Sequence, residues 1–107
     1  MYKVRYSEAA KRDLEQIGDY IMTELSNPQA ALGTVRKIQN SIDRLCTFPE
    51  IGSPLSSIAD TISDYRFLVC GNYLTFYRLL GSDIMVDRII NGKRDYMKIL
   101  FGNACDD

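Results

Sequence analysis

Histidine and tryptophan are both absent from this chain of 107 residues. The lack of histidine removes the commonest general base and the commonest metal ligand, so we expect neither a metal site nor a cofactor. No apolar run approaches the roughly 20 residues that a membrane-spanning helix needs. No apolar leader precedes the first expected strand, so we do not expect secretion through a cleaved signal.

Cysteine is also scarce. Cys46, Cys70 and Cys105 are odd in number and widely spaced. This pattern is typical of unpaired thiols in a reducing compartment and not of a disulfide framework. We expect a cytoplasmic protein in which Cys46 and Cys70 are small core residues and Cys105 is a loose thiol near the end.

The balance of charge differs along the chain. Apolar residues make up 46% and charged residues 25%, which is ordinary for one globular domain spanning residues 1–107. The net charge is −1, but residues 65–101 carry six basic and three acidic side chains. This basic excess indicates a surface for an anionic or carboxylate-bearing partner. It is too small for a protein that works through phosphate contacts alone, so we expect no sequence-specific DNA binding by this chain on its own.

The first half of the chain predicts a short strand followed by two helices. Residues 3–6 alternate polar and apolar, which favours an edge strand, and Ser7 offers an N-cap for a helix. Asn27 and Pro28 end that helix and begin a second one, and so short a connection makes the pair an antiparallel hairpin. The two apolar stripes comprise Ala10, Leu14, Ile17, Ile21 and Leu25, then Ala31, Val35, Ile38, Ile42 and Leu45.

Residues 65–101 predict three strands and a short terminal helix. Tyr, Phe, Val, Ile and Leu fill the runs between turn signals at residues 71–72, 81–83 and 91–92. The connections are too short for helical crossovers, so the strands form an antiparallel meander. The expected fold is α+β, with a four-stranded antiparallel sheet packed against an N-terminal helical hairpin in the order β-α-α-β-β-β, and a short C-terminal helix.

Both faces of this sheet are rich in apolar side chains. The helical hairpin covers only one of them, and the other is larger than the apolar patches that monomers usually expose. We therefore expect an obligate partner on the open face and self-association of the isolated chain. The alternative is that residues 96–101 fold back over it. The irregular connector at residues 47–64 is either a mobile functional loop or a packed cover held by Ile51, Leu55 and Ile58.

An ordered set of short motifs accompanies this arrangement of elements, and it resembles the RelE/ParE toxins of bacterial type II toxin–antitoxin modules. The resemblance spans residues 2–101. The motifs are Tyr6-Ser7, Ala9-Ala10, Asp13-Leu14, Ile17, Tyr20-Ile21, Leu45, Phe48-Pro49, Gly52, Tyr65-Arg66, Gly71-Asn72-Tyr73, Phe76-Tyr77-Arg78, Arg88-Ile89-Ile90 and Gly92-Lys93-Arg94-Asp95.

The resemblance implies one of two activities. RelE-like toxins cut mRNA in the ribosomal A site, whereas ParE-like toxins share the fold, lack the catalytic set and act on DNA gyrase. Only part of the nuclease pattern is present, because Leu74 stands where an arginine is expected and Leu100 where a late tyrosine is expected. Arginine stabilises phosphate charge but is a poor base. We therefore expect a ParE-like toxin that binds DNA gyrase, has no enzymatic activity of its own and is neutralised by a cognate antitoxin.

Two alternatives stay open. One is a ribosome-dependent mRNA endonuclease with Arg66, Lys93, Arg94 and Tyr96 near the phosphate. The other is a non-toxic binding module of the same fold.

The same residues give the candidate contact sites. Arg66 and Arg94 are expected to meet the target or an acidic part of the antitoxin, and Arg88 is alternatively a structural ion pair with Asp87 or Asp95. The margins of the helix stripes are expected to form a groove for an antitoxin helix. The target-binding candidates are Arg66, Arg78, Arg88, Arg94, Tyr96 and Lys98, and the antitoxin-binding candidates are Leu14, Ile17, Ile21, Val35 and Ile38.

Overall fold

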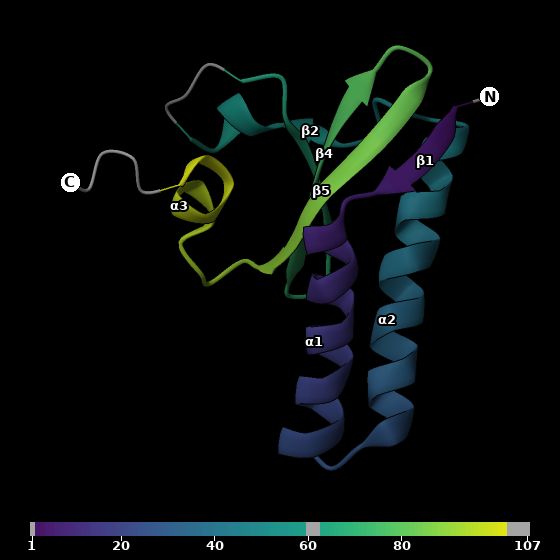
Figure 1. The fold of residues 1–107 in the computed structure, drawn as a ribbon, viewed down its shortest axis with the longest axis vertical. Coiled ribbons are helices and arrows are strands. Elements are labelled where there is room, and N and C mark those ends of the chain that lie inside the picture. Colours follow the sequence, from purple (N-terminus) through teal and green to yellow (C-terminus); the bar gives the residue numbers. More distant parts are fainter. Residues whose placement is uncertain (1, 60–62, 103–107) are drawn as a thin grey trace.

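Two long helices pack against one face of a five-stranded sheet, and a short helix lies on the other face (Figure 1). The structure is a computed structural model that describes residues 2–59 and 63–102. The strands lie in the order β1-β5-β4-β3-β2. The elements are β1 (Lys3–Tyr6), α1 (Glu8–Glu24), α2 (Pro28–Asp43), the 3-10 turn η1 (Arg44–Cys46), β2 (Ser53–Pro54), the 3-10 turn η2 (Leu55–Ser57), β3 (Arg66–Cys70), β4 (Tyr73–Leu80), β5 (Asp83–Asn91) and α3 (Tyr96–Phe101).

The sheet has one more strand than expected and is not wholly antiparallel. β3, β4 and β5 form the predicted meander. β1 runs parallel to β5, with Val4 opposite Ile84 and Tyr6 opposite Val86. The antiparallel prediction was wrong for β1 because no hairpin joins it to β5 and fixes their relative direction. The additional strand, β2, is a two-residue pairing with β3 inside the connector, too short to leave a period in the sequence.

Capping side chains fix where the two long helices begin. Ser7 Oγ accepts a hydrogen bond from Ala10 N at 2.9 Å, and Asn27 Oδ1 accepts one from Ala30 N at 3.0 Å. The helices form the predicted hairpin, and its turn projects beyond the end of the sheet (Figure 1). In the described part of the chain, no helix has both the length and the apolarity to cross a membrane. The main core contains Ala10, Leu14, Ile17, Ile21, Ala31, Ile38, Ile42, Leu45, Tyr77, Ile84, Val86 and Ile89.

The second face of the sheet is covered by the chain's own C-terminal segment, so the prediction of an exposed apolar face was wrong. α3 lies across this face and forms a second core with Phe67, Phe76 and Ile90. Phe76 is 0% exposed, and its ring lies 5.4 Å from that of Tyr96, centroid to centroid. The alternative that residues 96–101 fold back is confirmed. Self-association through this face therefore has no structural basis.

A β-bulge changes the register between β4 and β5. Phe76 pairs with Arg88 and Tyr77 pairs with Val86, so Asp87 has no partner across the ladder. The bulge shifts the alternation of side chains along β5, so that Ile89, and not Arg88, joins Val86 in the main core. A bulge inserts one residue and re-aims the side chains around it.

The connector after α2 packs as a cover over the range that the structure describes, residues 47–59 and 63–64. Leu55 is fully buried, whereas Ile51 and Ile58 are 41% and 46% exposed. Only one of the three residues expected to hold the cover is therefore a core residue.

Neither Cys46 nor Cys70 is fully buried. Both are free thiols of intermediate exposure. Cys105 lies outside the described residues.

Tyr77 fastens the connector to the sheet. Its hydroxyl donates to Pro49 O at 2.8 Å and accepts from Gly52 N at 3.0 Å. A Cβ at position 52 would lie 2.6 Å from this hydroxyl, so only glycine allows the close approach. Tyr77 is 0% exposed, and its phenol satisfies the buried N–H of Gly52 and the partly buried carbonyl of Pro49.

Tyr77→Phe is expected to lower the free energy of unfolding by about 1–3 kcal/mol, because it leaves the buried N–H of Gly52 and the partly buried carbonyl of Pro49 without this partner. Urea unfolding measures the change. Tyr73→Phe is the matched control, since no hydrogen bond of its hydroxyl is found among the described residues. Equal stability of wild type and Tyr77→Phe would show that the Tyr77 hydroxyl does not help to hold the connector.

Candidate functional site

Asp13 joins α1 to β5 through three hydrogen bonds. Its carboxylate accepts from Arg88 Nε at 2.8 Å, Arg88 Nη2 at 2.9 Å and Ile89 N at 2.8 Å. The Asp13 side chain is 8% exposed, so these donors replace the water that a buried carboxylate loses. The hydrogen bond to Asp13 raises the pKa of the Arg88 guanidinium. Arg88 thus forms a structural ion pair, but its partner is Asp13 and not Asp87 or Asp95.

Ser7 and Asp13, at the start of α1, extend the hydrogen bonding that β1 makes to the edge of β5. β1 pairs with β5 only as far as Val86. Beyond that point, Ser7 N donates to Val86 O at 2.9 Å and Ser7 Oγ donates to Asp87 O at 2.7 Å. Asp13 then takes the N–H of Ile89. Ser7, the N-cap of α1, and Asp13 within α1 therefore pair with the part of the β5 edge that β1 leaves open.

Arg78 is engaged within the protein. Its Nε donates to Asp87 Oδ2 at 2.9 Å, and its guanidinium carbon lies 5.3 Å from the centre of the Tyr65 ring. Tyr65 Oη donates to the same carboxylate oxygen at 2.7 Å. The bulge residue Asp87 thus neutralises the charge of Arg78, a residue that the sequence predicts to contact the target.

Arg66 is engaged as well. Its Nη1 donates to Gly52 O at 2.7 Å and to Glu50 O at 3.3 Å, which ties β3 to the connector. Arg66 in β3 lies opposite Tyr77 in β4. Tyr73, at the other end of β4, lies opposite Asn91 at the end of β5. Four residues of strand span roughly 13 Å, so Arg66 is distant from the turn that follows β5.

Lys93 and Arg94 occupy that turn and face a cleft between α1 and the end of the sheet. The turn is fixed because Asn91 Oδ1 accepts from Lys93 N at 2.9 Å and Asn91 O accepts from Arg94 N at 3.0 Å. Both side chains are exposed, and neither forms a hydrogen bond or ion pair within residues 2–59 and 63–102. The cleft encloses about 430 Å³ and is lined by Asp13, Gln16, Ile17, Tyr20, Tyr73, Ile89, Asn91, Lys93 and Arg94.

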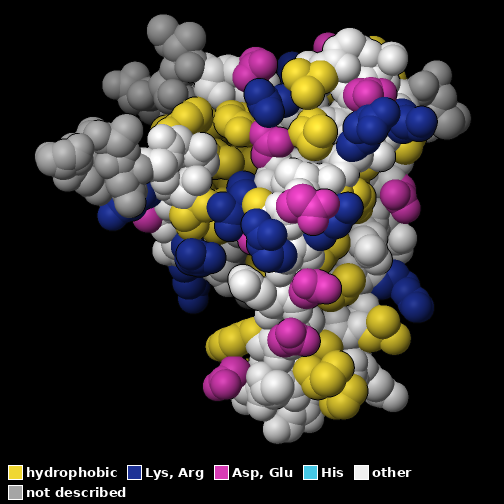
Figure 2. All heavy atoms as spheres, in the orientation of Figure 1, with side chains coloured by type: hydrophobic (Ala, Val, Ile, Leu, Met, Phe, Trp, Pro, Cys, Tyr) yellow, Lys and Arg dark blue, Asp and Glu magenta, His cyan; other side chains and the backbone are white. Residues whose placement is uncertain are grey.

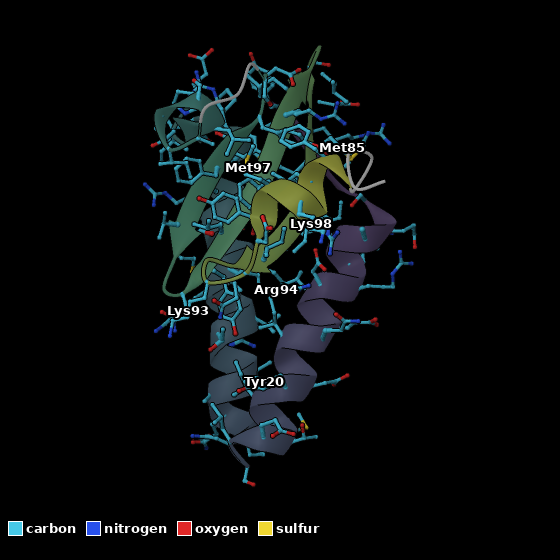
Figure 3. The ribbon with its side chains drawn as sticks, turned by 90° about the vertical axis from the view of Figure 1, so that its left-hand side faces the viewer. Tyr20, Met85, Lys93, Arg94, Met97 and Lys98 are labelled. Atoms are coloured by element: carbon cyan, nitrogen blue, oxygen red, sulfur yellow. The ribbon has the colours of Figure 1, made fainter. Side chains whose placement is uncertain are left out.

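The figures place this cleft where the long helices leave the sheet. In Figure 3, Lys93 and Arg94 lie at the end of the sheet and Tyr20 lies farther along the hairpin. Figure 2 shows Lys and Arg side chains gathered near the middle of the molecule, interspersed with acidic ones. The cleft has an apolar floor of Ile17 and Ile89, and two cations on its rim.

The remaining candidates on α3 lie apart from the cleft lining. Tyr96 is half-buried against Phe76 on the opposite face of the sheet. Lys98 is exposed on the same short helix (Figure 3). The arrangement can bind an anion at the rim of the cleft. The described residues hold no cluster of three or more potential metal-ligating side chains.

Comparison with known proteins identifies the family. The family model described as the ParE toxin of the type II toxin–antitoxin system parDE matches residues 4–96. The chain belongs to this family. Y4kP, a candidate toxin of Sinorhizobium fredii, is 28% identical over 100 residues, which cover 92% of this chain and 96% of that protein.

Solved structures agree with the ParE assignment at the level of the fold. A chain of the chromosomal ParDE toxin–antitoxin system of P. aeruginosa matches with a TM-score of 0.72 and 24% identity, over 85% of this chain and 96% of that chain. A chain of the RelBE2 toxin–antitoxin complex of Mycobacterium tuberculosis matches with a TM-score of 0.55 and 20% identity, over 84% and 96%. The RelE/ParE fold predicted from the sequence is confirmed.

Most of the antitoxin-binding candidates lie in the core of this ParE-family chain. Ile38 is 0% exposed and Ile21 is 6% exposed, so neither offers a surface to a partner. Ile17 reaches the floor of the cationic cleft. Leu14 and Val35 line a separate hollow of about 470 Å³ between α1 and α2, together with Tyr6, Lys11, Glu15, Gly18 and Gln39.

Sequence reasoning missed the role of Asp13 and the contribution of Gln16 and Tyr20. A signal for Asp13 was present: it follows Ala10 by three positions and precedes Ile17 by four, so it falls within the buried stripe of α1. A carboxylate in such a stripe needs buried donors. Tyr20 is 56% exposed and belongs to no core cluster. It lies outside the apolar stripe of α1, so the sequence pattern gave no sign that it lines a cleft.

Asp13→Asn is expected to lower the free energy of unfolding by about 2–3 kcal/mol, because it replaces a charged acceptor of three hydrogen bonds by a neutral amide. Denaturant titration measures the loss. Lys11→Ala is the control, because its 3.3 Å pair with Glu8 is exposed on both sides and is worth less than about 1 kcal/mol. Similar stabilities of the two variants would contradict the role assigned to Asp13.

Burial raises the pKa of three tyrosines, Tyr6, Tyr65 and Tyr77, so these phenols are expected to ionise late. Burial, helped by the hydrogen bond to Asp87, raises the pKa of Tyr65 to about 12. Burial and the nearby charge of Asp43 raise the pKa of Tyr6 to about 12. The unfolded phenols lose their protons near 10, so the stability that these groups contribute is complete below pH 10 and declines as the pH rises through 12. In an absorbance titration, Tyr65→Phe should remove a group from the late part of the curve. Loss of a group from the early part would contradict the assignment.

Proposed function

We propose that this ParE-family toxin inhibits growth by binding DNA gyrase and has no nuclease activity of its own. The observation that carries the proposal is a pair of exposed cations, Lys93 and Arg94, on a turn fixed by Asn91 at the rim of a cleft. Their side chains have no partner within residues 2–59 and 63–102. An exposed, pre-positioned cationic pair suits binding to an anionic surface of a large target.

The separation of the nuclease candidates supports binding over RNA cleavage. Arg66 is bound to backbone carbonyl groups along β3, Tyr96 is packed on the opposite face of the sheet, and only Lys93 and Arg94 share a cleft. Cleavage through a 2′-oxygen needs a base, an acid and positive charge in mutual reach. The Asp13 carboxylate in the cleft is already occupied by three donors. Of the four nuclease candidates, only the two cations lie together, which supports charge stabilisation over a complete acid–base set.

The structure narrows the target-binding candidates that we propose. Arg66, Arg78 and Arg88 have partners inside the protein and act as structural groups. Arg94 and Lys98 are retained as target contacts, and Lys93 is added to them. Tyr96 is omitted because its ring belongs to the second core.

We also propose a cognate antitoxin as the partner that neutralises the toxin. Both matched structures belong to toxin–antitoxin systems, and the fold is shared with them. The hollow between α1 and α2, with Leu14 and Val35 in its lining, is a concave surface that suits an apolar side chain of an antitoxin helix.

The test compares purified toxin in a gyrase supercoiling assay and in ribosome-dependent mRNA cleavage. We expect inhibition of gyrase and intact mRNA. Arg94→Glu should weaken gyrase inhibition on the order of tenfold, because it reverses a charge at the contact surface. Arg36→Glu on the exposed side of α2 is the matched control and should inhibit as wild type does.

Cleavage of ribosome-bound mRNA with gyrase unaffected would replace the proposal by the RelE-type activity. If neither activity is found and expression leaves growth normal, the chain is a non-toxic binding module of this fold.

A further inference from the structure

The cleft between α1 and the end of the sheet combines two kinds of surface that one ligand can use together. Its floor is apolar, with Ile17 and Ile89 only 8% and 2% exposed. Its rim carries Lys93 and Arg94, both exposed. A volume of about 430 Å³ lies within the range of roughly 300–1,000 Å³ that is typical of ligand pockets.

The charge available in the lining of the cleft is positive. Asp13 is the one acidic residue among the lining residues, and its carboxylate is shared by Arg88 and Ile89 N. Lys93 and Arg94 have no such partner in the described part of the chain. A ligand with a negative group therefore finds two donors at the rim without displacing an existing ion pair.

Tyr20 extends the apolar surface at the mouth of the cleft. Its side chain is 56% exposed although it is large and aromatic, and it lies beyond the sheet on the projecting part of α1 (Figure 3). Exposed aromatic side chains beside a cationic rim are common anchors of protein interfaces.

We propose that this cleft binds an acidic side chain of the antitoxin together with an apolar side chain next to it. The carboxylate pairs with Lys93 and Arg94, and the apolar group fills the space over Ile17 and Ile89 beside the Tyr20 ring. The inference rests on the proposed function only for the identity of the partner. Binding dominated by phosphate contacts needs more than two cations, and the chain as a whole carries a net charge of −1. These charges favour a peptide carboxylate over nucleic acid as the ligand.

Two consequences distinguish this cleft from the hollow between α1 and α2. Binding in the cleft depends on salt, because its rim is charged and exposed. Antitoxin bound there also covers Lys93 and Arg94, which are proposed target contacts. Neutralisation then follows from direct competition and needs no change of fold.

The first experiment tests the chemistry of the cleft on the isolated toxin. Phenylbutyrate is the probe, and phenylbutanol is the uncharged control of the same shape. Heteronuclear NMR of isotope-labelled toxin should show shifts at Ile17, Ile89 and Asn91, with phenylbutyrate binding on the order of tenfold more tightly. The double variant Lys93→Glu with Arg94→Glu should lose this preference, and Arg36→Glu should keep it. Equal binding of the two probes, or shifts elsewhere, overturns the proposal.

The second experiment tests the partner. The affinity of the toxin for its co-expressed antitoxin is measured in wild type, in Arg94→Glu and in Arg36→Glu. We expect a loss of about tenfold or more in Arg94→Glu only, and restoration by one Asp or Glu to Lys change in the antitoxin. An unchanged affinity, or no restoring change, overturns the proposal. Neither experiment depends on gyrase, so failure of the gyrase assay is separate from failure of this inference.

Discussion

The contact that the rest of the structure depends on is the buried carboxylate of Asp13 between α1 and β5. It accepts two hydrogen bonds from Arg88 and one from Ile89 N, on an edge of the sheet that β1 leaves unpaired. An open strand edge needs partners, and a buried carboxylate needs donors. Here the strand edge and Arg88 supply the donors that the Asp13 carboxylate needs, and the carboxylate supplies the acceptor that the edge needs. These bonds fix the height and rotation of α1 over the sheet.

The cleft is a consequence of that arrangement. The hairpin of α1 and α2 continues beyond the sheet, while the chain turns back from β5 into α3 (Figure 1). The space between them is bounded by α1 on one side and by the turn of Lys93 and Arg94 on the other. Two arginines of the sheet serve the scaffold instead: Arg78 pairs with the bulge residue Asp87, and Arg66 ties β3 to the connector.

Much of the fold was predictable because local signals and the final contacts agree. The caps at Ser7 and Asn27, the two helix stripes and the β3–β5 meander follow from residue spacing. The parallel direction of β1 and the bulge at Asp87 depend on contacts between distant residues, which no local period records. For the same reason Arg88 and Arg94 looked alike in the sequence. In the structure, Arg88 forms an ion pair with the buried Asp13, whereas Arg94 is exposed and forms no ion pair within residues 2–59 and 63–102. Packing of α3 against the second face was predicted only as an alternative, because six residues carry too little pattern to show which surface they cover.

Hydrogen exchange in the free toxin and in its complex with the antitoxin tests the central claim most directly. The account predicts that antitoxin binding slows exchange at residues 89–94 and along residues 16–20 of α1, the two segments that line the cleft. Slowed exchange confined to α2 or to the connector, with residues 89–94 unchanged, would contradict the claim that the cationic cleft is the recognition surface of this toxin.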